Sequence, residues 1–147
     1  MSQRIVFLCP HNAAKSVIAA AYFQDLADRQ GLSLHATSAG TEPSTAVAPA
    51  VVEVLRRDGL DVAGYQPRRV TQEELGTAAR VVSLGCDLHD FTLATVPVEH
   101  WDEVPPPSKD LGAACAAIRA RVERLVSELQ TARSAPEEEG RASSWRR

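Results

Sequence analysis

An apolar run that ends abruptly at a cysteine constrains the fold of this chain more than any other feature. Residues Ile5 to Leu8 are all apolar, which is typical of a strand covered on both faces in a parallel sheet. The dipeptide Cys9-Pro10 cannot comfortably continue that strand. The Ala-rich stretch from Ala13 to about Arg29 then predicts a helix, with Gly31 as its C-terminal stop. The chain therefore opens with a strand, a short loop and a helix.

The rest of the chain repeats this alternation. We expect further strands at 32–37, 80–85 and 96–101, and helices at 49–57, from 71 onward and at 110–130. Strands alternating with helices predict βαβ units and a parallel sheet in an α/β fold. Residues 1–132 then form one domain. The polar segment 133–147 has no periodicity and is predicted to be a disordered tail.

Composition excludes several classes of protein. A chain of 147 residues has the length of a single domain. Its net charge of −3 argues against a nucleic-acid binder. No apolar run approaches the roughly 20 residues that cross a bilayer, so no membrane partner is expected. Three cysteines, an odd number, do not form a secreted disulfide framework, so we expect a cytoplasmic protein.

The loop after the first strand brings three chemical features together. Cys9 places a thiol where the strand ends, and the following backbone N–H groups lead into a helix N-terminus, which attracts anions. Lys15 adds a full positive charge nearby. Helix N-termini and cations favour a thiolate, so Cys9 is a candidate nucleophile toward a bound oxyanion. The alternative interpretation is a buried thiol at Cys9 and a surface charge at Lys15.

The sequence of residues 5–16, IVFLCPHNAAKS, resembles the signature of the low-molecular-weight protein tyrosine phosphatases and of the arsenate reductases built on the same fold. The segment from Ser38 to Pro43, SAGTEP, is also similar, and the resemblance extends over roughly residues 4–130. A lysine at position 15, where the phosphatases have arginine, is similar to the arsenate–mycothiol transferase subgroup.

The resemblance implies a three-layer α/β fold. Its four-stranded parallel sheet is flanked by helices, phosphatase-I-like, with a phosphate-binding loop after the first strand. It implies that Cys9 is the nucleophile, Lys15 an oxyanion ligand and Ser16 a hydrogen-bond donor to the thiolate. Asn12 would shape the loop. The remaining oxyanion-binding positions would be Pro10, His11, Ala13 and Ala14.

The resemblance also implies a reaction. Arsenate, a small oxyanion, would be the substrate, and mycothiol would be the thiol cosubstrate, with no tightly bound cofactor and no metal. The product would be an arseno–thiol adduct, which a mycoredoxin or thioredoxin-like protein would reduce.

The loop itself departs from the family pattern at three positions. Pro10 removes one backbone N–H from the oxyanion loop. Ala13 and Ala14 replace two glycines, so any left-handed conformation there would be strained. His11 either contacts the anion or is a solvent-exposed spacer.

Two further roles stay open. The family's general acid, an aspartate before proline, is missing, and Asp102 or Glu103 either replaces it after a loop shift or is a solvated carboxylate. Cys86, at the end of the third expected strand, is either a resolving thiol or an ordinary buried thiol. Arg68 and Arg69 are either a basic rim near the pocket or, as the default interpretation, a solvated pair.

Three functions are compatible with these residues. The first is an arsenate reductase-type enzyme that uses Cys9 and a thiol cosubstrate. The second is a repurposed enzyme of the same fold that acts on a phosphorylated or other metabolite in a biosynthetic pathway. The third is a non-catalytic module that binds oxyanions.

Overall fold

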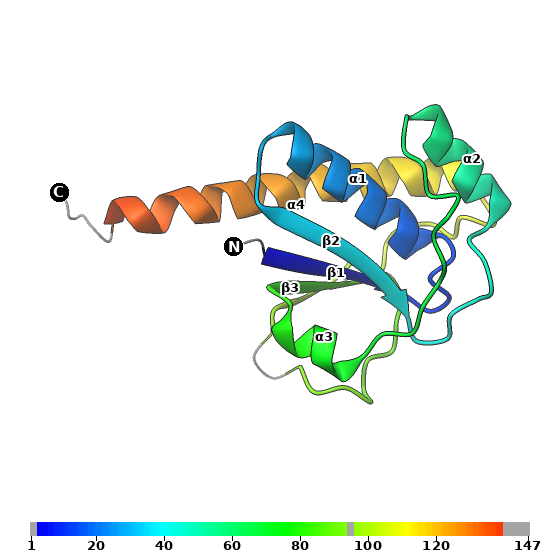
Figure 1. Cartoon of the computed structure of the whole chain (residues 1–147), viewed down its shortest axis with the longest axis horizontal. Helices are drawn as coiled ribbons and strands as arrows, with labels where there is room; N and C mark the ends of the chain where they lie inside the picture. The colour runs from blue at the N-terminus through cyan, green and yellow to red at the C-terminus, as the bar shows by residue number, and fades with distance from the viewer. Residues whose placement is uncertain (1–2, 94–95, 140–147) are drawn as a thin grey trace.

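The computed structural model describes residues 3–93 and 96–139, with side chains described up to residue 131. The strands are β1 (Gln3–Cys9), β2 (Leu34–Gly40), β3 (Arg80–Ser83) and β4 (Val98–His100). The helices are α1 (Lys15–Arg29), α2 (Pro49–Arg57), α3 (Gln72–Thr77) and α4 (Leu111–Glu139). Figure 1 shows α1, α2 and α4 on one side of the sheet and α3 on the other.

All four strands are parallel and lie in the order β2-β1-β3-β4. The register of β1 with β2 runs from Gln3 opposite Leu34 to Cys9 opposite Gly40. The predicted four-stranded parallel sheet flanked by helices is thus confirmed. Because β1 lies inside the sheet, its carboxyl end opens beside β2 and β3, and ligands bind at such ends in open α/β sheets.

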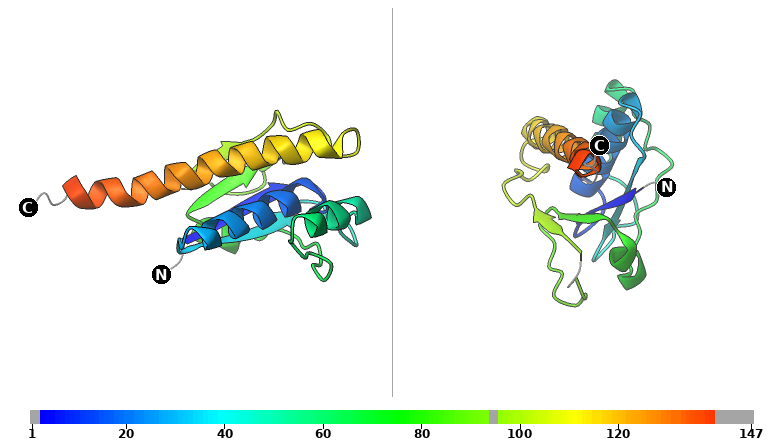
Figure 2. Two further views of the ribbon diagram at one scale, coloured as in Figure 1. Left: turned by 90° about the horizontal axis from the view of Figure 1, so that it is seen from above. Right: turned by 90° about the vertical axis from the view of Figure 1, so that its left-hand side faces the viewer.

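Alternate side chains of β1 enter two separate cores. Ile5, Phe7 and Cys9 pack in the cluster that contains α1 and α4. Val6 and Leu8 pack on the opposite face with Leu75 of α3. Both faces are therefore buried, as an unbroken apolar strand requires. Figure 2 shows α4 crossing the sheet beside α1 and continuing well past it.

Aromatic side chains fill the larger core. The ring of Phe7 lies 5.5 Å from that of Phe23 on α1 and 5.7 Å from that of Trp101, centroid to centroid. Both pairs are tilted, a favourable geometry for aromatic rings. Trp101 is fully buried just after β4, so it anchors the start of the loop that leads to α4.

Several predicted boundaries differ from the structure; for example, the strands expected at 80–85 and 96–101 are shorter, at 80–83 and 98–100. The first helix begins at Lys15 instead of Ala13, because residues 11–14 form the loop. The second strand continues through Gly40 because its partner β1 continues to Cys9. Helix α4 extends to Glu139, into the segment predicted to be disordered, since adding residues to an existing helix is easier than starting one. Residues 140–147 lie outside the described residues, so the tail remains a prediction there.

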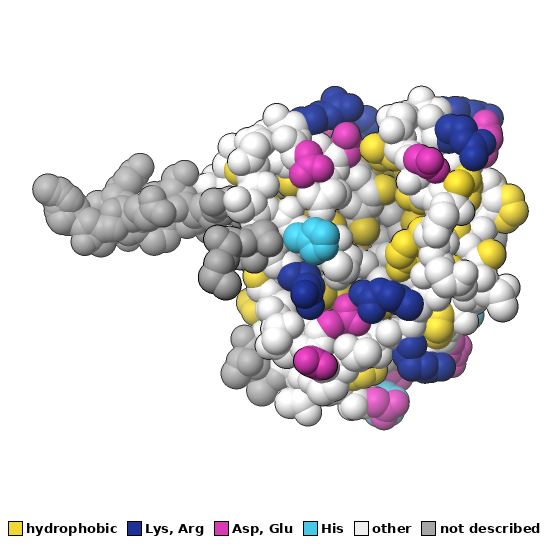
Figure 3. All heavy atoms as spheres, in the orientation of Figure 1, with side chains coloured by type: hydrophobic (Ala, Val, Ile, Leu, Met, Phe, Trp, Pro, Cys, Tyr) yellow, Lys and Arg dark blue, Asp and Glu magenta, His cyan; other side chains and the backbone are white. Residues whose placement is uncertain are grey.

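The described surface carries charges of both signs. Figure 3 shows Lys and Arg side chains interspersed with Asp and Glu side chains on one face. In the parts of the chain that the structure describes, no helix combines the length and the apolar composition needed to cross a membrane.

Candidate active site

The Cys9 sulfur is held by Ser16, seven residues further along the chain. The backbone N–H of Ser16 donates to Cys9 Sγ at 3.3 Å, and the thiol donates to Ser16 Oγ at 3.0 Å. Both residues are buried, and Ala14 caps α1 without a side-chain hydrogen bond. The loop therefore wraps around the sulfur, with an uncapped helix N-terminus that attracts negative charge.

Asn12 shapes the loop in two ways. Its φ of 52° is the one left-handed value among the described non-glycine residues, so Ala13 and Ala14 avoid the strain expected from their replacing glycines. Its Nδ2 donates to Ser16 Oγ at 2.8 Å. Because Asn12 already supplies that oxygen with a donor, the Ser16 hydroxyl can give its own proton to the sulfur once Cys9 is ionised.

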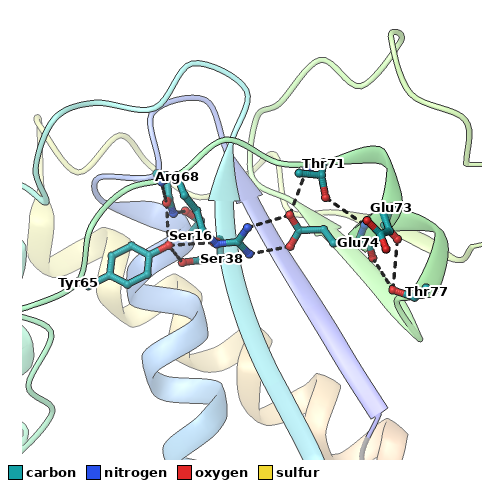
Figure 4. Close-up of polar contacts among 9 residues, drawn as sticks. Ser16, Ser38, Tyr65, Arg68, Thr71, Glu73, Glu74 and Thr77 are labelled. Atoms are coloured by element: carbon teal, nitrogen blue, oxygen red, sulfur yellow. Dashed lines mark hydrogen bonds and ion pairs between the residues drawn. The ribbon is translucent and has the colours of Figure 1, made fainter.

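Tyr65 supports Asn12 from a distant part of the chain. Its hydroxyl donates to Asn12 Oδ1 at 2.8 Å and lies 2.9 Å from the carbonyl oxygen of Ser38. The hydroxyl of Ser38 donates to the Tyr65 oxygen at 2.9 Å. Figure 4 shows the Tyr65 hydroxyl directed at Ser38 of β2. The loop is thereby joined to the sheet and to the segment after α2.

Arg68 joins the same network to the opposite face of the sheet. Its backbone N–H donates to Asn12 Oδ1 at 3.0 Å, and its guanidinium makes two bonds to the Glu74 carboxylate at 2.9 and 2.6 Å. Figure 4 shows this paired arrangement. The interpretation of Arg68 as a solvated residue is therefore wrong, because a buried carboxylate on α3 pairs with it.

Glu74 is also part of the predicted capping box of α3, which is confirmed. The backbone N–H of Glu74 donates to Thr71 Oγ1, and that of Thr71 donates to Glu74 Oε1, both at 3.1 Å. Burial raises the pKa of Glu74, but the bonds from Arg68 and Thr71 and the Arg68 charge outweigh it, so the pKa is lower than usual. Glu74 therefore remains an anion near neutral pH.

The segment 41–48 clamps the other side of the loop through backbone bonds. The N–H groups of Glu42, Ser44 and Ala48 donate to the carbonyl oxygens of three loop residues, at 2.7, 2.9 and 3.0 Å. Those acceptors are Pro10, His11 and Ala13. Pro10, although it lacks an N–H, thus contributes its carbonyl to the loop's support.

Gly40 permits the close approach of loop and sheet. A methyl group at this position would lie 2.6 Å from the carbonyl oxygen of Pro10 and 3.0 Å from Cβ of Asn12. The first contact is shorter than a Cβ atom can make and the second is tight, so glycine lets the loop rest on the end of β2 without moving it.

A cavity of about 350 Å³ opens above the sulfur. Cys9, His11 and Lys15 supply its titratable side chains, and none of its described lining residues is a carboxylate. The remaining walls are formed by small or apolar residues and two serines: Pro10, Ala13, Ala14, Ser44, Ala48, Ala50, Val51, Pro107, Ser108 and Leu111. An anion above the sulfur would thus meet Lys15 and backbone N–H groups in a largely apolar setting, where electrostatic attraction is strong.

Cys86 lies close enough to this site to interact with it. Burial raises the pKa of its thiol to about 11, as does the charge of Cys9, while hydrogen bonds with Thr41 and the charge of Lys15 oppose the rise. The Lys15 ammonium also lies 3.4 Å from the position of a Cβ on Gly85, the residue before Cys86. Lys15 therefore sits between the loop of Cys9 and the end of β3.

The structure does not bring the two candidate acids to the cavity. Glu103 Oε2 accepts a hydrogen bond from Arg121 Nε at 2.5 Å, and this bond lowers the pKa of Glu103. Asp102 is exposed beside it. The loop before α4 turns Pro107 and Ser108 toward the cavity instead.

Sequence reasoning placed Cys9, Asn12, Lys15 and Ser16 together, and the structure does so too. It missed the hydrogen bonds of Tyr65 and Arg68 to Asn12, because no local pattern announces partners more than fifty residues away. It also did not pair Arg68 with Glu74, six residues further along the chain. In the described parts of the chain, no three His, Cys, Asp or Glu side chains are grouped so that they could share a metal ion.

Comparison with known sequences identifies related proteins. The family model described as low molecular weight phosphotyrosine protein phosphatase matches residues 4–135. A Halobacterium salinarum protein named "Putative arsenate reductase" is 30% identical over 125 residues, which cover 84% of this chain and 87% of the relative.

Comparison with solved structures gives the same fold. YfkJ from Bacillus subtilis has a TM-score of 0.80 at 23% identity, covering 89% of this chain and 96% of that one. A thioredoxin-dependent arsenate reductase from Corynebacterium glutamicum has a TM-score of 0.78 at 23% identity, and the match covers 89% of this chain and 63% of that one. An arsenate reductase from Archaeoglobus fulgidus has a TM-score of 0.67 at 31% identity, and the match covers 84% of this chain and 98% of that one.

Proposed function

The chain belongs to the low molecular weight phosphotyrosine protein phosphatase family, and on that premise we propose that it is an arsenate reductase-type enzyme with Cys9 as nucleophile. The names of the relatives from Halobacterium salinarum and Archaeoglobus fulgidus support this choice of substrate. The observation that carries the proposal is the cavity itself, in which the sulfur held by Ser16 and the Lys15 cation meet without a carboxylate.

The proposed first step is attack of the Cys9 thiolate on arsenic. The sulfur–arsenic bond forms and one arsenic–oxygen bond breaks, and that oxygen takes up protons and leaves as water. The remaining arsenate oxygens stay in the loop, where backbone N–H groups and Lys15 balance their charge. The Ser16 N–H donates to the sulfur, and the Ser16 hydroxyl would donate to it once Cys9 is ionised, so both would stabilise and aim the thiolate.

The missing carboxylate favours arsenate over phosphate esters. A general acid contributes roughly 10²–10⁴-fold to reactions that must protonate a leaving oxygen, and phosphomonoester hydrolysis depends on it. Arsenate exchanges its oxygens with less help. A cavity whose described lining offers no carboxylate therefore hinders the phosphatase reaction more than the arsenate reaction.

The reducing thiol has two candidates. The first is mycothiol, as the lysine of the loop implies by resemblance. Its sulfur would displace Cys9 from arsenic and leave as an arseno–thiol adduct, which a mycoredoxin-type protein would then reduce. Cys9 is regenerated as a free thiolate by this route, and arsenic stays pentavalent until the adduct is reduced.

The second candidate is Cys86, whose interactions with Cys9 and Lys15 support it. Its thiolate would attack Cys9 Sγ and form a disulfide, while the sulfur–arsenic electron pair moves to arsenic and leaves arsenite. A thioredoxin-like dithiol would then reduce the disulfide. The pKa of about 11 disfavours this route, because few Cys86 thiols are ionised at neutral pH.

The test measures arsenite production from arsenate with either mycothiol plus mycoredoxin or thioredoxin plus its reductase. We expect activity that disappears in Cys9→Ser. Cys86→Ser retains activity by the mycothiol route and loses it by the disulfide route, so this variant identifies the reductant. No arsenite above the Cys9→Ser background in either system would overturn the proposal.

The size of the cavity favours a second candidate function. Arsenate has five heavy atoms and leaves much of the 350 Å³ unfilled, and the walls near Val51, Pro107 and Leu111 are apolar. A phosphorylated metabolite with an apolar group would fill that space. Cys9-dependent phosphate release from such compounds, without arsenite production, would support this function instead.

A further inference from the structure

The proposed reaction needs a proton at the leaving oxygen, and the expected donors are elsewhere. Glu103 is bound to Arg121 on α4, and neither it nor Asp102 is among the residues that line the cavity above Cys9. The donor must therefore be one of the titratable side chains of the cavity wall.

Those side chains are Cys9, Lys15 and His11. Cys9 is the nucleophile and must give up its own proton to act. The Lys15 ammonium lies toward Gly85 and β3, where its charge lowers the pKa of Cys86 and would balance the charge of an oxyanion in the loop. His11 is left as the one group of the described wall without another function in the proposed step.

The contacts of His11 fix which ring nitrogen can exchange a proton. Its Nδ1 lies 3.0 Å from the carbonyl oxygen of Glu42. A carbonyl oxygen only accepts hydrogen bonds, so Nδ1 must carry a hydrogen in this contact. Nε2 is then the nitrogen that gains or loses a proton, and the exposed ring can recover that proton from water.

The backbone of His11 is held as firmly as its ring. Its carbonyl oxygen accepts a bond from the Ser44 N–H at 2.9 Å, and the neighbouring Pro10 carbonyl accepts one from Glu42 at 2.7 Å. Segment 41–48 thus fixes both the main chain and the imidazole at the cavity wall. A preorganised group of this kind can transfer a proton without first being reoriented.

We propose that His11 is the proton donor to the leaving oxygen. This inference rests on the proposed function. As Cys9 Sγ bonds to the central atom, the bond to the leaving oxygen breaks and its electron pair stays on that oxygen. This oxygen, a hydroxyl of the arsenate or the ester oxygen of a phosphate ester, takes the Nε2 proton and departs as water or as an alcohol. His11 becomes neutral and is reprotonated by solvent.

The test compares His11→Asn with wild type on two aryl phosphates. The asparagine amide can replace the Nδ1 bond to Glu42 but cannot transfer a proton at neutral pH. Phenyl phosphate needs a protonated leaving group, whereas 4-nitrophenyl phosphate does not. We expect a loss of about 10²-fold with phenyl phosphate and less than about threefold with 4-nitrophenyl phosphate. His11→Ala, which removes the clamp as well, should slow both substrates.

Equal losses of His11→Asn on the two substrates, or no loss on either, would overturn the assignment of His11. If wild type hydrolyses neither ester, the rate of Cys9 arsenylation is measured instead by rapid quenching and mass spectrometry. At least a tenfold slower rate is expected in His11→Asn, and an unchanged rate overturns the inference. Failure of the proposed function gives a different result, namely no Cys9-dependent reaction of wild type with arsenate or with either ester.

Discussion

The Tyr65 hydroxyl donates a hydrogen bond to Asn12 Oδ1 across 53 residues of sequence, at 2.8 Å. Asn12 in turn donates to Ser16, and Ser16 holds the Cys9 sulfur. A residue outside the loop thereby reaches the nucleophile through two intermediates. The left-handed backbone of Asn12 gives this contact its importance, because a strained conformation persists only where its surroundings hold it.

Replacing Tyr65 by phenylalanine removes its hydrogen bond to Asn12 and the bond that its oxygen accepts from Ser38. We expect a loss of about 1 kcal/mol in the free energy of unfolding, since Arg68 still donates to Asn12. Alkylation of Cys9 by iodoacetamide, followed by peptide mass spectrometry, should slow several-fold because the loop is less well held. Tyr22→Phe is the matched control: it loses a bond to Asp58, far from the loop, and should leave Cys9 alkylation unchanged.

Replacing Gly40 by alanine tests the contact between loop and sheet. The added methyl group would lie 2.6 Å from the Pro10 carbonyl oxygen, so the loop must move. We expect the free energy of unfolding to fall by about 1–3 kcal/mol and most of the Cys9-dependent activity to be lost. In Gly76→Ala the added methyl group meets no atom within 4 Å, so this control variant should retain its stability and its activity. Full activity in Gly40→Ala would show that the loop has room to shift.

The reactivity of Cys86 should depend on the state of Cys9. Its pKa of about 11 predicts that alkylation at Cys86 accelerates with pH up to that range. Cys9→Ser removes a negative charge that raises this pKa, so the acceleration should begin at lower pH. Lys15→Met removes a positive charge that lowers the Cys86 pKa, so the acceleration of alkylation should begin at higher pH. Profiles that do not move in either variant would mean that the three groups do not interact.

The pair of Glu74 and Arg68 predicts how stability depends on pH. The pKa of Glu74 is lower in the folded protein than its ordinary 4.5, so its contribution is complete above about pH 4.5 and is lost as pH falls through the folded value. Glu74→Gln should lower the free energy of unfolding by about 1–2 kcal/mol at neutral pH, and this difference from wild type should shrink in acid. Urea unfolding at several pH values measures this. Glu73→Gln, on the same helix but exposed, should show neither effect.

Asp102→Asn and Glu103→Gln should leave the rate of arsenite production within about twofold of wild type. Neither carboxylate lines the cavity, and Glu103 is bound to Arg121 on the surface. A small loss of stability, below about 1 kcal/mol, is expected for Glu103→Gln because exposed ion pairs contribute little. A tenfold loss of turnover in either variant would show that the loop moves during the reaction and brings an acid to the site.

Local sequence patterns account for much of the fold. The apolar run of β1, the alternation of strands and helices and the capping box at Thr71 all appear where expected, because periodicity and capping act over a few residues. The extent of β2 was less predictable. Its last residues look like a turn in sequence, yet they pair with the end of β1 because the neighbouring strand continues that far.

The sequence by itself determined that a cysteine, a lysine and a serine meet at the end of a buried strand, because a strand, a tight loop and a helix follow one another there. Only the tertiary structure decided what holds that loop and what faces it. Tyr65 and Arg68 reach Asn12 through contacts between distant segments, and Glu103 is drawn away to Arg121. Such partners depend on how the helices and loops pack on the sheet, and no short stretch of sequence contains that information.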